Sequence, residues 1–482
     1  MRRGAKYPGK GKKGRSMSEK EVDDPEPLDF LRESESLQTE VQEETPQCSP
    51  ERKPFHVVLT TMSTTYLNWQ SEIMYYHFKK QQRLNPCTEM ANFTRLVAND
   101  GAQPDGLANK MPSIFYHQID TQTLDREYGS YAVLNRPHSV LQFVRDTFAF
   151  NNIKEDYIFF VETDHVFLRD IPNLATPDTP VGYPFGYMRP SPSYDAYVKK
   201  LWPNGSWNMT QQIGPSPLII YKDLLVKVAE PWSDFAKQLK ADPGTSRVFG
   251  WVLEMWGYAI AAASVGIRHK LIAEFQCEPG TASRLDAGYL QKYYIHHYTY
   301  GSEYTMNGAN MMNTIGEWSL DKRHYGGSYP PRNLKGPPRA AAERNYAALW
   351  LTNAWNEAMD GIEDWPTYPT LGTYGWRRES GTDAEIAASP IAQQVIDVHW
   401  SWSGIKGLIF KAHGELQTPW GKGKWGLVKA RSFSCDVDEP EKFCLFADFS
   451  NSLHNVYFNS TSEFTSRRIG DGETVKGLRV GV

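Results

Sequence analysis

One short segment constrains the fold of this 482-residue chain more than any other. Residues 157–161 are five apolar side chains that run directly into Glu162, Thr163, Asp164 and His165. An apolar run of this length predicts a buried strand, and polar residues at the carboxyl end of such a strand are typical of ligand sites in α/β sheets. Two carboxylates and an imidazole so spaced offer oxygen and nitrogen ligands to a divalent cation. The alternative is an acidic turn that closes the strand.

The segments before this strand predict the same sheet. Residues 55–60 form a β-branched and apolar run after a proline, and residues 69–80 then carry apolar side chains at helical spacing. A second strand is expected over 93–98, and a second helix over 139–148. Strand and helix thus alternate, as in an α/β fold.

Length and charge exclude several classes of protein. The chain is long enough for about three domains, which excludes a single small binding module. A formal net charge of −4 provides no basic field for nucleic acid, so no nucleic-acid partner is expected. The longest apolar stretch, at 258–265, is too short to span a membrane.

The amino-terminal region has a different composition. The first sixteen residues carry seven basic side chains, and residues 19–51 then carry twelve carboxylates. Segments so charged bury too little apolar surface to fold, so residues 1–52 are expected to be a disordered tail. No apolar segment follows the basic start, and no signal peptide is visible.

A second candidate site lies in residues 249–258. Trp251, Met255 and Tyr258 follow helical spacing and predict a buried stripe, within which Glu254 stands. A carboxylate buried on an apolar face is costly unless it has an ion-pair partner or a functional role. Glu254 is therefore a candidate catalytic base, an acceptor anchor, or the partner of an arginine such as Arg268.

Two further segments carry candidate residues. Residues 293–301 predict an aromatic strand in which His296 and His297 face opposite sides, so only one of them can complete a metal site with Asp164. Farther on, Lys322 and Arg323 offer cations able to hold a diphosphate. The alternative is a structural role for the histidines and an ordinary charged loop for the second segment.

The carboxyl-terminal part predicts a separate fold. A helix is expected over 340–358 and a linker over 366–399, and beyond 400 short apolar runs recur about every ten residues, which predicts a small all-β sandwich or barrel. Its tryptophans are either core residues or a surface for sugars; they are Trp400, Trp402, Trp420 and Trp425. Cys435 and Cys444 bracket a hairpin and are either a disulfide or two thiols.

Many short segments, in the same order, resemble the hydroxyproline O-arabinosyltransferase family over about residues 55–365. Those that carry the resemblance include 74–76, 93–95, 134–137, 154–157, 162–167, 172–175, 214–217, 249–255, 266–269, 297–301, 316–318, 321–323 and 331–334. The resemblance implies a GT-A type, Rossmann-like glycosyltransferase domain over 53–365. It does not extend to the β-rich domain that the apolar runs predict over 400–482. The peptidyl serine galactosyltransferases rank second, because their acidic motif looks more like Asp-x-Asp.

The resemblance also implies a UDP-sugar donor, a divalent metal such as Mn²⁺ and a hydroxyproline acceptor on a peptide or protein. The expected metal ligands are Glu162, Asp164, His165 and His297. Glu254 and Asp321 are expected to be catalytic. The donor is expected to contact Thr60, Arg95, Asn135, Arg136, Lys322 and Arg323.

Family members work in the Golgi behind an amino-terminal membrane anchor. The same secretory location is expected here, although no anchor is visible in this chain. Four glycosylation sequons, at Asn92, Asn204, Asn208 and Asn459, are compatible with that location. A catalytically silent member of the fold that binds glycoprotein is the alternative from another functional class.

Overall fold

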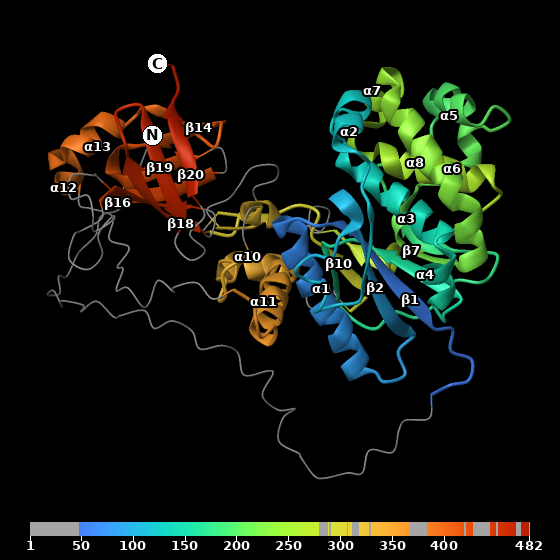
Figure 1. The fold of residues 1–482 in the computed structure, drawn as a ribbon. Helices are drawn as coiled ribbons and strands as arrows, with labels where there is room; N and C mark the ends of the chain where they lie inside the picture. The colour runs from blue at the N-terminus through green and yellow to red at the C-terminus, as the bar shows by residue number, and fades with distance from the viewer. Residues whose placement is uncertain are drawn as a thin grey trace, which may run out of the picture. The chain divides into compact units, whose positions relative to one another are not determined.

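The computed structural model describes residues 48–278, 288, 291–305, 307–310, 318–326, 329–366, 383–418, 421–427, 444–449, 452–468 and 474–481. Within these residues two folded regions can be recognised, an α/β region and a β-barrel (Figure 1). No helix among the described residues is long and apolar enough to cross a membrane.

A seven-stranded mixed sheet forms the centre of the α/β region. Its order is β3 (Ser113–His117), β2 (Met90–Asn99), β1 (Phe55–Met62), β4 (Tyr157–Val161), β7 (Ile213–Tyr221), β6 (Val181–Pro184) and β8 (Lys270–Leu271). β1 is parallel to β2 and β4, and β7 is antiparallel to β4. The carboxyl ends of β1 and β4 therefore meet at one edge of the sheet.

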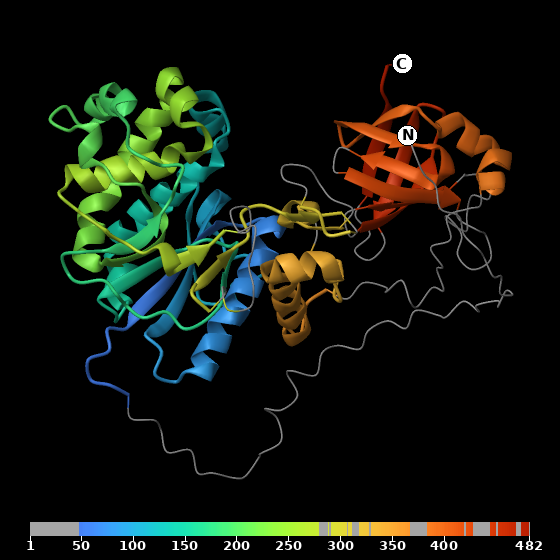
Figure 2. The same cartoon turned by 180° about the vertical axis from the view of Figure 1, so that it is seen from behind.

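Alternation along the strands divides the apolar side chains between two cores. In β4, Ile158 and Phe160 belong to one core, whereas Phe159 and Val161 belong to the other. On the first face lie α3 (Asn135–Arg145), α6 (Lys222–Ala241) and α8 (Leu253–Ser264); on the other lies α1 (Thr65–Leu84). The two ribbon views show the sheet between these layers (Figures 1 and 2).

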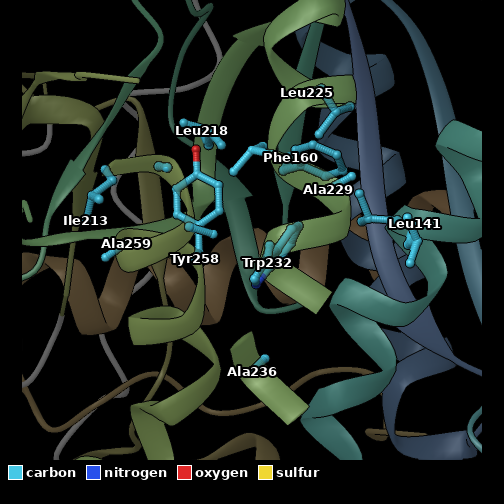
Figure 3. Packing of buried hydrophobic residues seen from close by; sticks show 14 of the residues in the cluster. Leu141, Phe160, Ile213, Leu218, Leu225, Ala229, Trp232, Ala236, Tyr258 and Ala259 are labelled. Atoms are coloured by element: carbon cyan, nitrogen blue, oxygen red, sulfur yellow. The ribbon is translucent and has the colours of Figure 1, made fainter. Parts of the chain in front are cut away.

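The closest helix contact on the first face joins α6 to α8. A Cβ added at Gly257 would come within 2.9 Å of backbone atoms of Ala236, so glycine is required there for the two helices to approach. Trp232 of α6 packs at this junction, with its ring 5.3 Å from that of Tyr258 (Figure 3). Shorter helices complete the region: α2 (Thr121–Tyr128), α4 (Thr147–Asn152), α5 (Asp195–Leu201) and α7 (Pro243–Phe249).

β5 and residues beyond 271 add a second layer around α1. A small sheet has the order β5 (His165–Phe167), β10 (Ile295–His297), β9 (Gln276–Cys277), and a hairpin pairs β11 (Ser302–Tyr304) with β12 (Trp318–Leu320). Helices α10 (Arg339–Arg344) and α11 (Tyr346–Gly361) follow. α11 packs on α1, where the Trp69 and Trp355 rings are 5.0 Å apart.

The second region is a closed eight-stranded antiparallel barrel, which decides between the predicted sandwich and barrel. Consecutive strands pair and the last pairs with the first: β13 (His399–Trp402), β14 (Ile405–Phe410), β15 (Glu415–Thr418), β16 (Gly421–Leu427), β17 (Cys444–Phe449), β18 (Ser452–Phe458), β19 (Glu463–Arg468) and β20 (Thr474–Arg479). Trp400, Trp402 and Trp425 are buried in its core, so they form no sugar-binding surface. Trp420 lies outside the described residues.

Several expectations about local structure need correction. Asp146 and Asn345 each interrupt a predicted helix, because their side chains cap the helix that follows. Part of the predicted linker folds as α12 (Asp383–Ala388) and α13 (Pro390–Val395), which contribute to the barrel core. Trp251 is exposed, because it lies in the short 3₁₀ turn Gly250–Val252 before α8.

The disulfide was not predicted either. It joins Cys48 to Cys87 and so ties the segment before β1 to the segment before β2. Cys48 lies within the predicted tail, whose residues 1–47 are outside the described part of the chain. The predicted alternatives for Cys435 and Cys444 also fall on residues or side chains that the structure does not describe.

Candidate functional site

The centre of the site is a cluster of Asp164, His165 and His297 at the carboxyl end of β4. β5 pairs antiparallel with β10, and His165 stands directly opposite His297 in that register. The two imidazole rings are 4.6 Å apart, and His297 Nε2 is 3.3 Å from Asp164 Oδ2. His296 points the other way and stacks on Trp350. The structure thus selects His297, as strand alternation required.

A lysine from a distant part of the chain closes the cluster. Lys322, in the 3₁₀ turn Lys322–Tyr325, donates to Asp164 Oδ2 across 158 residues of sequence. Burial opposes charge on Asp164, but Lys322 and His297 outweigh it and hold the pKa of Asp164 well below its usual value. Burial likewise opposes charge on His297, but the Asp164 carboxylate raises its pKa to about 10.

The residues present fit a divalent cation. Asp164, His165 and His297 each offer one ligand atom, and these atoms lie within 4.8 Å of one another. His165 Nε2 is buried without a hydrogen-bond partner, and a buried nitrogen of this kind is costly unless something binds it. One carboxylate and two imidazoles suit a manganese-like or zinc-like ion. Glu162, the fourth predicted ligand, is not in this group.

A chain of three charged groups connects the cluster to the core of the α/β region. Arg136, on α3, is 2.8 Å from Glu162 Oε2 and 3.2 Å from Glu254 Oε2. Glu254 in turn accepts a hydrogen bond from Trp232 Nε1 at 3.1 Å. Burial raises the pKa of Glu254 to about 7, although Arg136 acts in the opposite direction. The guanidinium thus joins one fully buried carboxylate to one that is partly exposed.

This geometry corrects the interpretation of Glu254. Its predicted partner, Arg268, donates instead to the Met209 carbonyl, and Glu254 pairs with Arg136. Glu254 is fully buried and held by Trp232 and Arg136. Its connection to Glu162 runs through Arg136, a geometry that favours a positioning role, and its catalytic role stays a prediction.

The predicted donor-binding residues divide into two groups. Arg95 is buried and paired with Asp105, and Asn135 accepts from the Ile119 amide, so the side chains of both are engaged in the scaffold. Thr60, near the carboxyl end of β1, has a buried hydroxyl without a hydrogen-bond partner. For Thr60 and Arg136 the donor contact stays a prediction.

The side chains of Asp321 and Arg323 form an ion pair. The Asp321 carboxylate accepts from the Arg323 backbone amide at 2.8 Å and from its guanidinium. Asp321 is buried, and by capping the turn it orients Lys322 beside Asp164. The catalytic role of Asp321 stays a prediction, as does donor binding by Lys322 and Arg323.

Sequence reasoning missed three residues near the cluster. Glu278 Oε1 is 3.6 Å from His297 Nδ1. The Tyr298 amide donates to the Asp164 carbonyl at 3.1 Å, and its hydroxyl donates to the Thr163 carbonyl at 3.2 Å. Tyr66 lies at the start of α1, close enough for Lys322 and Asp164 to influence its pKa, which burial raises. The aromatic run 293–300 was the only signal for Tyr298, and none marked the other two.

Comparison with solved structures adds a distant likeness. The galactosyltransferase LgtC, solved in complex with donor and acceptor sugar analogues, is 12% identical with a TM-score of 0.29, over 51% of this chain and 87% of that one. A bifunctional glycosyltransferase, WbbM, gives the same identity and TM-score over 53% and 48%. The α/β assignment therefore rests on the sheet topology itself.

Comparison of sequences is more specific. The N-terminal and C-terminal domain models of the hydroxyproline O-arabinosyltransferase family match residues 55–271 and 294–366. The chain is 40% identical to hydroxyproline O-arabinosyltransferase RDN2 from Medicago truncatula, over 66% of this chain and 83% of that protein. It is 39% identical to hydroxyproline O-arabinosyltransferase 3 from Arabidopsis thaliana, over 65% and 83%.

A peptidyl serine alpha-galactosyltransferase from Arabidopsis thaliana is less similar. It is 24% identical over 56% of this chain and 31% of that protein. Identity and coverage therefore both favour the first family, and its two domain models span the elements that carry the Asp164 cluster, from β1 to α11. The chain belongs to the hydroxyproline O-arabinosyltransferase family.

Proposed function

We propose that this chain transfers arabinose, as L-arabinofuranose, from a UDP-sugar to the hydroxyl of a peptidyl hydroxyproline. The observation that carries the proposal is the Asp164 cluster, in which His297 and Lys322 are brought to the end of β4 from far along the chain. A charged, buried cluster with an unpartnered imidazole nitrogen, here His165 Nε2, is unusual unless it binds something.

Asp164, His165 and His297 would hold a divalent cation, for which Mn²⁺ is our candidate. When bound, such an ion supplies positive charge to the diphosphate of the donor and so stabilises the leaving group. Lys322 and Arg323 add cationic groups on the same side, and Arg323 has the more exposed side chain. Together these side chains bind the donor and stabilise charge on the departing diphosphate.

The acceptor side of the site is defined by Glu162. Its side chain is 24% exposed, whereas those of Asp164 and Glu254 are 8% and 0% exposed. Glu162 is therefore the carboxylate of these three best able to accept a hydrogen bond from an acceptor hydroxyl. In the reaction that hydroxyl oxygen bonds to the anomeric carbon, the bond from that carbon to the diphosphate breaks, and the hydroxyl proton is released.

The decisive experiment measures transfer from a panel of UDP-sugars to a hydroxyproline peptide, with and without Mn²⁺. We expect metal-dependent transfer of arabinose that is lost in Asp164→Asn. Glu155→Gln is the matched control, because Glu155 is also a buried carboxylate beside a histidine but lies at the opposite edge of the sheet. Transfer of galactose to a serine peptide instead, or peptide binding without turnover, would overturn the proposal.

We also propose that the protein works in the lumen of the secretory pathway. The Cys48–Cys87 disulfide supports this location, because such bonds persist in oxidising compartments. The four sequon asparagines, Asn92, Asn204, Asn208 and Asn459, are all exposed, and the Asn92 amide also donates to Glu155. A mass shift on treatment of the cell-derived protein with an N-glycosidase would support the proposal, and reduced, unmodified protein would contradict it.

A further inference from the structure

One buried tyrosine holds the loop that carries Asp164. Residues 162–164 join β4 to β5, and two successive carbonyls of this loop accept hydrogen bonds from Tyr298. The Tyr298 amide donates to the Asp164 carbonyl at 3.1 Å, and the Tyr298 hydroxyl donates to the Thr163 carbonyl at 3.2 Å. The backbone on which the Asp164 carboxylate stands is therefore fixed at two points by the residue that follows His297.

The ring of Tyr298 rests on two buried tryptophans. It meets the ring of Trp355, on α11, edge to face at 5.1 Å, and Trp355 in turn meets Trp69, on α1, at 5.0 Å. All three side chains are buried in one core cluster. Because close-packed side chains of this size have few alternative rotamers, the hydroxyl that holds Thr163 has a fixed origin.

The turn that carries Lys322 is attached to the same tryptophans. Trp69 Nε1 donates to the carbonyl of Tyr325, the last residue of the turn, at 3.0 Å. The Tyr325 ring lies 6.1 Å from that of Trp69, and Lys322 Nζ lies 5.8 Å from the centre of the Tyr298 ring. The loop of Asp164 and the turn of Lys322 thus share one aromatic base, although they are far apart in sequence.

We propose that Tyr298 is a positioning residue, which sets the place of the Asp164 carboxylate for a divalent cation by holding the Thr163 and Asp164 carbonyls. This inference rests on the proposed function, in which the Asp164 cluster binds such a cation. Groups that orient a metal ligand from behind typically change metal affinity about 10- to 100-fold when they are removed.

The alternative is that the Tyr298 hydroxyl only stabilises the fold. Tyr304 is a matched control for this alternative, because it is buried in the same core cluster and its hydroxyl accepts a hydrogen bond from Asn345 Nδ2 at 2.7 Å. Replacement of either tyrosine by phenylalanine removes one buried hydroxyl and leaves its partner unpaired, which should lower stability to a similar extent. Only Tyr298→Phe releases the loop of Asp164.

The first test is calorimetric titration of the wild-type protein, Tyr298→Phe and Tyr304→Phe with Mn²⁺. We expect the Kd for Mn²⁺ to rise about tenfold in Tyr298→Phe and to be unchanged in Tyr304→Phe. Transfer from the UDP-sugar should fall in Tyr298→Phe at limiting Mn²⁺ and recover in excess Mn²⁺. Equal Mn²⁺ affinity in the three proteins would overturn the inference, as would a loss of transfer that excess Mn²⁺ does not restore.

A second measurement allows for differences in stability between the variants. Because a cation that binds the folded state raises Tm, each protein is unfolded by heat with and without Mn²⁺. The rise in Tm on addition of Mn²⁺ should be smaller for Tyr298→Phe than for Tyr304→Phe, and an equal rise would contradict the inference.

The two proposals fail in different ways. A wild-type protein that binds Mn²⁺ with an affinity dependent on Tyr298, but transfers no arabinose, would refute the proposed function and leave the role of Tyr298 standing. A wild-type protein that transfers arabinose, with Mn²⁺ affinity unaffected by Tyr298→Phe, would do the reverse.

Discussion

The two ends of strands β1 and β4 each carry a buried cluster of a carboxylate and histidine, and the clusters differ in how fully their polar atoms are bonded. At the amino-terminal end, His56 Nδ1 lies 3.1 Å from Glu155 Oε2 and His56 Nε2 lies 2.8 Å from Thr94 Oγ1. Asn92 Nδ2 donates to the other oxygen of Glu155 at 2.5 Å. Both ring nitrogens and both carboxylate oxygens therefore have a partner.

The cluster at the carboxyl end is less complete. His165 Nε2 has no hydrogen-bond partner although the ring is buried, and His297 Nδ1 has only the Glu278 carboxylate at 3.6 Å. Composition alone would not separate the two clusters, since both contain histidine beside a carboxylate. The difference teaches that unsatisfied polar atoms, rather than the residue types, distinguish a cluster that binds something from one that holds the sheet together.

The largest expected effect is on activity at the carboxyl end. Asp164→Asn should lower kcat about 10³-fold, because the variant loses the carboxylate that pairs with Lys322 and His297. Steady-state transfer assays would measure this loss, and circular dichroism would confirm that the variant is folded. An active Asp164→Asn variant would contradict the assignment of the functional site to the carboxyl-end cluster.

The disulfide should be the largest stabilising feature of the amino-terminal end. Cys87→Ser opens a loop with a sequence separation of 39 residues, and loss of that constraint should cost up to about 4 kcal/mol of unfolding free energy. Chemical denaturation would measure it. Since Cys87 precedes β2, far from Asp164 along these strands, activity of the folded fraction should be unchanged; a large loss of kcat would show that the two ends are not independent.

His56→Ala should lower stability by about 3 kcal/mol, because it leaves Glu155 buried with only Asn92 as a partner. Urea denaturation of the variant and the wild-type protein gives the comparison. Transfer activity per folded molecule should stay within twofold of wild type. The same substitution at His297 should instead abolish transfer activity, because it removes one of the candidate metal ligands.

The stability of the protein in acid should depend on the pair of His56 and Glu155. Burial would raise the pKa of Glu155, but hydrogen bonds from His56 and Asn92 outweigh it and lower the pKa to about 2, against 4.5 for an unperturbed glutamate. The stabilisation, about 3 kcal/mol, is fully present above about pH 4.5 and is lost as the pH falls towards 2. Glu155→Gln should flatten the stability curve in that window. Equal slopes for variant and wild type would contradict the pairing.

The smallest effect is expected at Glu254. Glu254→Gln retains the oxygen that accepts from Trp232 but removes the charge that holds Arg136, so kcat should fall only about tenfold, in line with a positioning role. A catalytic base would cost as much as Asp164→Asn. The matched variant Arg136→Lys should show a similar loss, because lysine cannot span both carboxylates in the same way.

Local sequence determined much of the framework. The strand at 157–161 and the acidic motif after it lie where predicted, because a short apolar run must be buried on both faces and its polar continuation must leave the sheet. Strand alternation correctly separated His296 from His297. Recurring apolar runs predicted the all-β domain, and the resemblance identified the family.

Contacts between distant segments were decided only by the tertiary structure. Lys322 reaches Asp164, Arg136 rather than Arg268 pairs with Glu254, and Cys48 joins Cys87. No local pattern encodes such pairs, because each depends on how strands and helices pack in three dimensions. Arg95 shows the same limit, since its burial beside Asp105 follows from the pairing of β2 with β3 and not from its neighbours in sequence.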